Sequence, residues 1–263
     1  MSPRNDEKLS FGGHLEVFRR MLFRIIAMAG AIAMIVFCFK ETTWRVLMAP
    51  SEWNFCIYRW VEAAMQAVGI NFHFEEFHVQ MIATDLSSQF MTHVTTSVYL
   101  GLLGASPYIL YELFRFISPA LYEHERRYSV QVAGIIYVLF LLGVLMSYFV
   151  LFPISFRFLG TYSVSARVVS NITLDSYIST FVSLTLLMGV VFQLPVIAFF
   201  LGKLGFVTSS MLANYRKHSF IGIMLVAAVI TPPDLMTLIL VTIPLYLLYE
   251  VSIRVVSWVE PEE

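Results

Sequence analysis

The sequence predicts an all-α integral membrane protein with six transmembrane helices. Of its 263 residues, 58% are hydrophobic and 13% are charged, whereas soluble proteins carry about 25% charged residues. The mean hydropathy of the chain is +0.75. A chain of this length has room for roughly six spans of about 20 residues each. We therefore expect residues 1–263 to form a single membrane domain, with spans at roughly 21–39, 90–114, 128–152, 176–201, 217–231 and 235–253.

The first span, 21–39, is apolar apart from Arg24. Leu15, Phe18 and Leu22 stand at helical spacing just before and at its start, which predicts that the span continues from a short amphipathic helix at the membrane interface.

Residues 40–86 form the longest hydrophilic segment, yet aromatic residues are spread through it. Aromatic side chains with a polar tip suit the membrane interface, so this segment predicts an aromatic-rich external cap. Within it, the stretch from Trp53 to Val68 predicts a short helix that ends at Gly69.

Dense charge and two prolines separate the second span, 90–114, from the third. Ser118 and Pro119 are typical of a helix start, with serine as the N-cap and proline at the first helical position. Three glutamates crowd this hairpin: Glu112, Glu123 and Glu125. The pattern leaves two interpretations open, a solvated loop beside lipid headgroups or a binding site for a cationic partner.

Residues 128–152 and 176–201 lack any charged residue, which predicts spans three and four. Between them, residues 153–175 are expected to form a second external loop. Gln193 lies deep in the fourth span, where an amide must face protein or water. The last two apolar runs are short and joined by Thr231-Pro-Pro-Asp234, which predicts a helical hairpin too short to cross the bilayer fully.

The basic residues predict the orientation. Of the 17 Lys and Arg, the twelve in the two terminal segments and in the loops at 114–127 and 202–217 fall on one face of the predicted topology. Five fall on the other face: Lys40, Arg45, Arg59, Arg157 and Arg167. Both termini are therefore expected to be cytoplasmic.

The sequence contains no phosphate loop, zinc-protease motif, nucleophile elbow or cysteine pair with metal spacing. We therefore expect no catalytic residues, no metal and no cofactor, and the net charge of -1 argues against a nucleic-acid partner. A receptor for a cationic ligand or peptide is the leading hypothesis. A small-solute secondary transporter, which needs polar groups at mid-depth, and a membrane scaffold are the alternatives.

Several motifs resemble the TatC family, the receptor core of the twin-arginine protein translocase. The match runs in order from about residue 9 to residue 256. It rests on His14-Leu15-Glu16 with Arg19-Arg20, Ala49-Pro50, Pro119-Ala-Leu-Tyr-Glu-His-Glu-Arg-Arg127, Phe152-Pro153, Phe192-Gln-Leu-Pro195 and Thr231-Pro-Pro-Asp234.

The resemblance implies a multi-pass protein of the cytoplasmic (inner) membrane that recognises the Arg-Arg pair in signal peptides of folded cargo. It also implies self-association, and recruitment of TatA- and TatB-like single-span partners for export driven by the proton-motive force. Carboxylates accept planar guanidiniums bidentately, which favours Arg over Lys. Residue by residue, the implied signal-binding glutamate is Glu125, with Phe116, Pro119, Leu121, Tyr122 and Arg126 shaping its loop. The implied structural or assembly positions are Pro50, Gln193, Pro232, Pro233 and Asp234.

The chain departs from the family pattern at two positions. Members carry a glutamate where this chain has Val17, and Glu16 stands one residue earlier, about 100° away around a helix. The second carboxylate of the arginine site is then Glu16 or Glu123. At Gln193 some members have a buried glutamate, and an amide cannot take up a proton as a carboxylate does.

Overall fold

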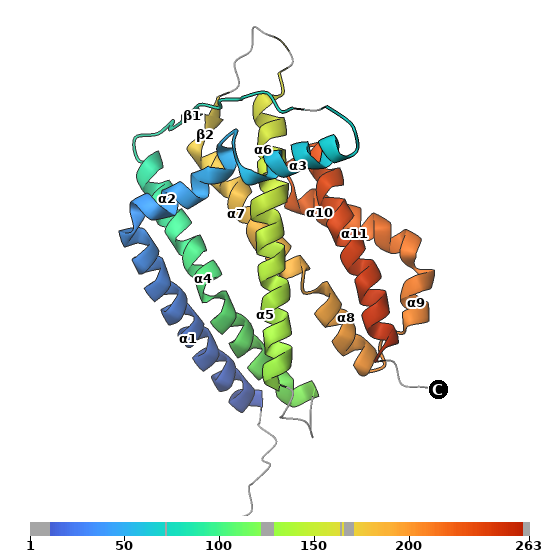
Figure 1. The fold of residues 1–263 in the computed structure, drawn as a ribbon. Helices are drawn as coiled ribbons and strands as arrows, with labels where there is room; N and C mark the ends of the chain where they lie inside the picture. The colour runs from blue at the N-terminus through green and yellow to red at the C-terminus, as the bar shows by residue number, and fades with distance from the viewer. Residues whose placement is uncertain (1–10, 72, 122–128, 164, 166–170, 260–263) are drawn as a thin grey trace, which may run out of the picture.

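Long helices run side by side along the molecule, and shorter elements cover one of its ends (Figure 1). The computed structural model describes residues 11–71, 73–121, 129–163, 165 and 171–259. The long helices and helix pairs are α1 (Phe11–Cys38), α4 (Ser88–Leu121), α5 (Ser129–Met146) with α6 (Phe152–Thr161), α7 (Leu174–Val191) with α8 (Leu194–Lys203), α10 (Arg216–Ile230) and α11 (Leu235–Ser257). A one-turn helix, α9 (Ser209–Asn214), precedes α10.

Helix α1 packs along α4, and small residues bring the two backbones close together. A Cβ built on Gly101 of α4 would lie 2.6 Å from the Cβ of Ala33 and 2.7 Å from the carbonyl oxygen of Ala29, both on α1. Such contacts leave no space for a side chain, as in the small-residue interfaces of membrane helices. The amphipathic segment predicted before the first span is confirmed as the start of a continuous α1, which begins ten residues before position 21.

The third and fourth predicted spans are interrupted helices. After α5 the chain makes one turn of π-helix, Ser147–Leu151, and continues as α6, so the external loop expected from residue 153 was wrong for residues 153–161. Pro153 is tolerated because it lies in the first turn of α6. In the fourth span, α7 ends at Val191 and α8 begins at Leu194, since Pro195 lacks the N–H that a continuous helix needs.

The prediction of two short final helices holds for α10, with 15 residues, but is wrong for α11, with 23. Helix α11 continues four residues beyond the predicted end at 253, and both Glu250 and Arg254 lie inside it. The Glu250 carboxylate accepts from Arg216 at both oxygens, at 2.8 Å and 3.0 Å. This bidentate pair neutralises the charge of Glu250 and allows the helix to continue.

The expected aromatic cap lies at one end of the bundle. It contains α2 (Lys40–Met48), a 3₁₀ turn (Ala49–Ser51), α3 (Cys56–Ala67) and a two-residue strand β1 (Met81–Ile82), which pairs in parallel with β2 (Ile172–Thr173). The predicted helix end at Gly69 is confirmed by its positive φ of 84°. The cap contributes Tyr58 and Phe77 to the same hydrophobic core as Phe152 and Leu184 of the bundle.

Arg157 joins this cap to the bundle. Its guanidinium carbon lies 5.2 Å, 4.4 Å and 4.7 Å from the ring centroids of Tyr58, Phe74 and Phe77. The cation is therefore held by three aromatic faces and by the carbonyl oxygen of Glu75, at 2.9 Å. Burial raises the pKa of the Tyr58 phenol, which stays protonated and donates to the Pro153 carbonyl oxygen at 2.8 Å.

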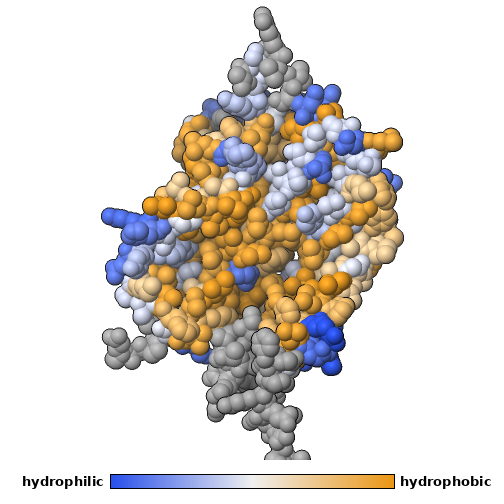
Figure 2. Space-filling view, turned by 180° about the vertical axis from the view of Figure 1, so that it is seen from behind, coloured by the Kyte–Doolittle hydropathy of each residue, from blue (hydrophilic) through white to orange (hydrophobic). Residues whose placement is uncertain are grey.

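Four helical segments among the described residues are long and apolar enough to cross a membrane: Leu15–Cys38, Val132–Thr161, Leu174–Lys203 and Leu235–Ser257. Helix α10 is too short by this measure, and α4 carries a buried polar group of Thr92, His93, Thr96 and Ser97. Hydrophobic residues dominate the middle of the face shown in Figure 2, with hydrophilic residues mainly toward its edges and ends. Helix α1 begins and α11 ends at the same end of the bundle, opposite the cap (Figure 1).

The α1–α4 contact predicts a position-specific effect of added volume. We expect Gly101→Ala to lower stability by about 1–3 kcal/mol, the usual cost of overpacking. Gly30→Ala on α1 is the matched control, because a Cβ there meets nothing within 4 Å. Thermal unfolding of the detergent-purified protein measures both variants. Equal unfolding midpoints for the two would contradict the close approach of α1 and α4.

Candidate functional site

The predicted binding residues fall at the end opposite the cap, where α1 begins and α4 ends. Glu16 lies on α1 and Phe116 on α4. Pro119 and Leu121 lie in the last turn of α4, so the predicted helix start at Ser118 and Pro119 was wrong. The remaining predicted residues lie outside the described residues: Tyr122, Glu123, Glu125 and Arg126.

Between α1 and α4 there is a small cavity of about 120 Å³, which we call the α1–α4 pocket. It lies toward the C-terminal end of α4, because its lining residue Phe116 is near that end. The predicted binding residues from Tyr122 onward follow in the sequence. Residues three, four and seven apart share one face of a helix, and the lining follows that spacing on both helices. The lining residues are Val17, Met21 and Arg24 on α1 and Glu112, Arg115 and Phe116 on α4.

Glu112 provides the negative charge of the pocket. Its side chain is only 5% exposed, and its Oε1 lies 3.3 Å from Nη1 of Arg24, whose side chain is 49% exposed. Tyr108 donates its hydroxyl to the same oxygen at 2.9 Å. A buried carboxylate is costly unless it is paired, and Arg24 and Tyr108 supply the partners of Glu112.

Sequence reasoning noted Arg24 and Glu112 separately but did not bring them together. The available signal was that Arg24 is the one charged residue in an otherwise apolar first span. A charge in such a segment is usually paired with an opposite charge on a neighbouring helix. Glu112 was instead grouped with Glu123 and Glu125 because it is close to them in sequence.

Glu16 is not among the residues that line the pocket. Its Oε1 accepts from Nη2 of Arg19 at 3.0 Å and from Nε of Arg20 at 2.9 Å, both on its own helix. The rotation of about 100° per residue places Val17, rather than Glu16, on the face toward α4. Of the two carboxylates proposed from sequence, Glu16 thus lies outside the α1–α4 pocket.

The pocket combines groups that suit a guanidinium. A carboxylate accepts its paired N–H donors, and an aromatic face attracts its positive charge. Phe116 supplies the aromatic face and lies against Phe18, with ring centroids 5.7 Å apart and the planes tilted by 54°. Val17 and Met21 supply apolar surface for a methylene stem. In this structure, Arg24 supplies the guanidinium that lies near Glu112.

The other predicted positions have structural contacts. Pro50 is buried in the 3₁₀ turn of the cap. Gln193 lies at the α7–α8 break and donates its Nε2 to the Ile136 carbonyl oxygen at 3.1 Å. Asp234 caps α11, with Oδ1 accepting from the Thr237 N–H at 2.7 Å, and Pro232 and Pro233 precede it in the α10–α11 turn.

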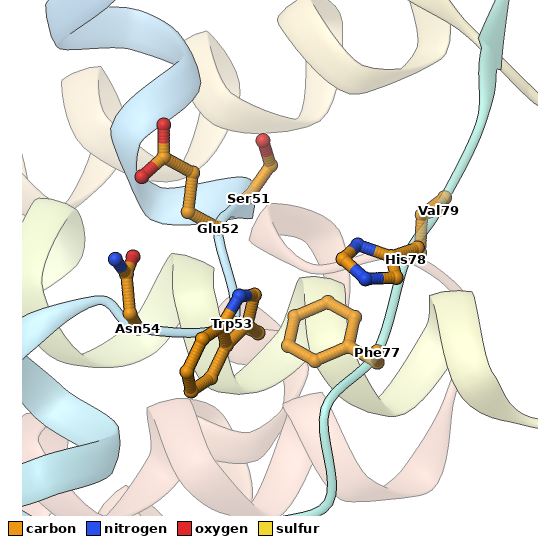
Figure 3. Close-up of a pocket in the computed structure, with 7 residues that line it drawn as sticks. All are labelled: Ser51, Glu52, Trp53, Asn54, Phe77, His78 and Val79. Carbon is orange, nitrogen blue, oxygen red and sulfur yellow. The ribbon is translucent and has the colours of Figure 1, made fainter.

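A second cavity, of about 260 Å³, lies in the cap (Figure 3). The indole of Trp53 and the ring of Phe77 lie side by side there, with the His78 ring above Phe77. The remaining lining residues are Ser51, Glu52, Asn54 and Val79. Apart from the carboxylate of Glu52, which is exposed, the lining holds no acidic group. It therefore suits a guanidinium less well than the α1–α4 pocket.

Comparison with known proteins gives a consistent result. The family model for the Sec-independent protein translocase protein (TatC) matches residues 13–244. A TatC of Blattabacterium sp. subsp. Periplaneta americana (strain BPLAN) is 30% identical over 260 residues, which cover 97% of this chain and 98% of that protein. TatCy of Bacillus subtilis (strain 168) is 38% identical over 173 residues, which cover 66% of this chain and 68% of that protein.

A solved structure is also similar. The crystal structure of the twin-arginine translocase receptor TatC superposes with a TM-score of 0.73 at 29% sequence identity. The superposition covers 94% of this chain and 99% of that chain. The same arrangement of helices is therefore found in a protein from this family.

The Arg24–Glu112 pair predicts a measurable coupling. In a double-mutant cycle with Arg24→Gln and Glu112→Gln, we expect a coupling energy of about 0.5–3 kcal/mol in the free energy of unfolding, as for other contacting pairs. The control cycle uses Glu16→Gln and Arg20→Gln, whose pair is exposed and within one helix. Its coupling should be smaller. Additive effects of the Arg24 and Glu112 variants would contradict the pair.

Proposed function

The chain belongs to the TatC family of Sec-independent protein translocase proteins, and on this premise we propose that it is the translocase receptor for Arg-Arg signal peptides of folded cargo. The observation that carries the proposal is the α1–α4 pocket, which presents a carboxylate and an aromatic face on α4, the helix that precedes Glu125 in the sequence. Binding by oriented carboxylates explains a preference for arginine, since a guanidinium is accepted bidentately and an ammonium is not.

We propose that the protein lies in the cytoplasmic membrane as one domain with six spans and that the end with the α1–α4 pocket faces the cytoplasm. The excess of Lys and Arg in the segments assigned to that face supports this orientation. The position of the start of α1 and the end of α11 at one end of the bundle agrees with termini on a shared side (Figure 1).

TatA- and TatB-like single-span proteins are the proposed partners, together with further copies of the chain. Helix α10 supports this assignment. Its 15 residues rise about 22 Å, less than the roughly 30 Å of a bilayer core. A short helix thins the bilayer locally or packs against a neighbour. Exposed apolar residues on α10, among them Val229 at 85% and Leu225 at 65%, are available for such packing.

The contacts of Gln193 bear on the transporter alternative. A solute carrier needs polar groups at mid-depth that are available to a substrate. Gln193 and the region 104–106 are the polar groups that the sequence offers for this role, and the Gln193 amide nitrogen donates to the Ile136 carbonyl oxygen at the α7–α8 break. The contact favours a role in helix packing, so we retain the receptor as the proposed function.

The proposal predicts that the purified protein binds an Arg-Arg signal peptide at least roughly tenfold more tightly than its Lys-Lys twin, as expected for loss of charge-assisted bidentate contacts. Glu125→Gln should remove most of this preference, and Glu125→Lys should abolish binding. Glu52→Gln, at the exposed cap, is the matched control. Fluorescence anisotropy with labelled peptides measures the affinities. Equal affinity of the parent protein for both peptides would overturn the proposal.

A further inference from the structure

We infer that Glu112 is the second carboxylate of the arginine site and that Arg24 occupies its guanidinium position until an arginine of the signal peptide replaces it. This inference rests on the proposed function and names a residue that the family pattern does not supply. It assigns one arginine of the Arg-Arg pair to the α1–α4 pocket and leaves the other for Glu125.

The first step is the absence of a carboxylate where the family pattern has one. Val17 takes that position, and its side chain lines the pocket. The neighbouring Glu16 accepts from Arg19 and Arg20 on its own helix instead. Among the described residues that line the pocket, Glu112 is the one acidic group. A guanidinium entering from the end of α4 therefore finds its acceptor on α4 and not on α1.

The second step is that the Arg24 contact is replaceable. It is one contact of 3.3 Å from one nitrogen, whereas two parallel N–H donors on a carboxylate make a stronger bond. About half of the Arg24 side chain is exposed, so its guanidinium can move into solvent without leaving a buried charge. Glu112, by contrast, is buried and needs a cation at all times. When a peptide guanidinium replaces that of Arg24, Arg24 moves into solvent and Glu112 keeps a paired cation.

The third step concerns the charge around the site. Arg115 also lines the pocket, so the lining carries two basic residues and one acidic residue. An incoming arginine would add a third cation, which favours departure of Arg24 over simple addition. The peptide arginine and Arg24 then compete for Glu112. The apparent affinity for the peptide is the intrinsic affinity multiplied by the fraction of sites that Arg24 leaves open.

The fourth step concerns reach. Helix α4 rises roughly 13 Å from Glu112 to Leu121, its last described residue, and Glu125 follows shortly after. Neighbouring side chains of an extended peptide point to opposite sides, so an Arg-Arg pair can address two carboxylates that are not adjacent. We therefore expect each carboxylate to bind a different arginine of the pair.

The experiment measures binding of four signal peptides, Arg-Arg, Lys-Arg, Arg-Lys and Lys-Lys, to the full-length protein in detergent. The variants are Glu112→Gln, Glu125→Gln and the control Glu16→Gln. We expect Glu112→Gln to weaken Arg-Arg binding roughly tenfold and to remove discrimination at one of the two arginine positions only. Glu125→Gln should remove discrimination at the other position. Glu16→Gln should leave both intact.

Two further variants keep the inference testable if Glu112→Gln folds poorly. Arg24→Gln keeps an amide donor near Glu112 but removes the competing cation, and should tighten Arg-Arg binding several-fold, on the order of threefold to tenfold. Val17→Glu places a carboxylate in the same pocket and should restore discrimination to Glu112→Gln. Leu15→Glu, at an exposed position of α1, is its control and should not restore it.

The outcomes separate the inference from the proposed function. If the parent protein does not prefer Arg-Arg over Lys-Lys, both are overturned. If the parent protein prefers Arg-Arg and Glu112→Gln retains discrimination at both positions, the inference alone is overturned. Weaker Arg-Arg binding by Arg24→Gln, or equal rescue by Leu15→Glu and Val17→Glu, would also overturn it, because the effect would then be one of general charge.

Discussion

A charge inside an apolar bundle must have a partner, and much of this structure follows from that constraint. The buried Glu112 is held by Arg24 across the α1–α4 contact, and the partly exposed Glu250 is paired with Arg216 across the α10–α11 pair. The cation of Arg157 lies among three aromatic rings that tie the cap to the bundle. Each contact joins segments distant in sequence, so the paired charges add position-specific contacts to the close packing of the helices.

The positions of the prolines follow from a second constraint, because each backbone polar group inside the bilayer needs a hydrogen-bond partner. Pro153 and Pro195 lie in the first turns of α6 and α8, where a missing N–H costs nothing. At the α7–α8 break the side chain of Gln193 reaches the Ile136 carbonyl oxygen on α5. This hydrogen bond joins the α7–α8 break to α5, and an amide is sufficient to donate it.

Local sequence signals predicted the helices well and their ends less well. Unbroken apolar runs predicted the bundle, and Gly69 predicted the end of α3, where the structure gives it a positive φ. Both signals depend on residues that are near in sequence. The length of α11 could not be read in this way, since Glu250 looks like a helix end until Arg216 is placed beside it. The α1–α4 pocket was missed for the same reason. The pairing of Arg24 with Glu112 is a long-range contact, and proximity along the chain pointed to a different grouping of the glutamates.

Val17 shows that a sequence motif and a binding site in space are not equivalent. A family motif assigns a role to a place in the sequence, but a guanidinium responds to a carboxylate at a place in space. An acid on α4 instead of α1 lies in the same pocket but in different surroundings, because Glu112 is buried and already paired, whereas Val17 on α1 is exposed. The pocket therefore still offers a carboxylate, and Arg24 occupies the place that a ligand guanidinium would take. The proposed receptor would discriminate through exchange of cations, with the side chain of Arg24 setting how readily that exchange occurs.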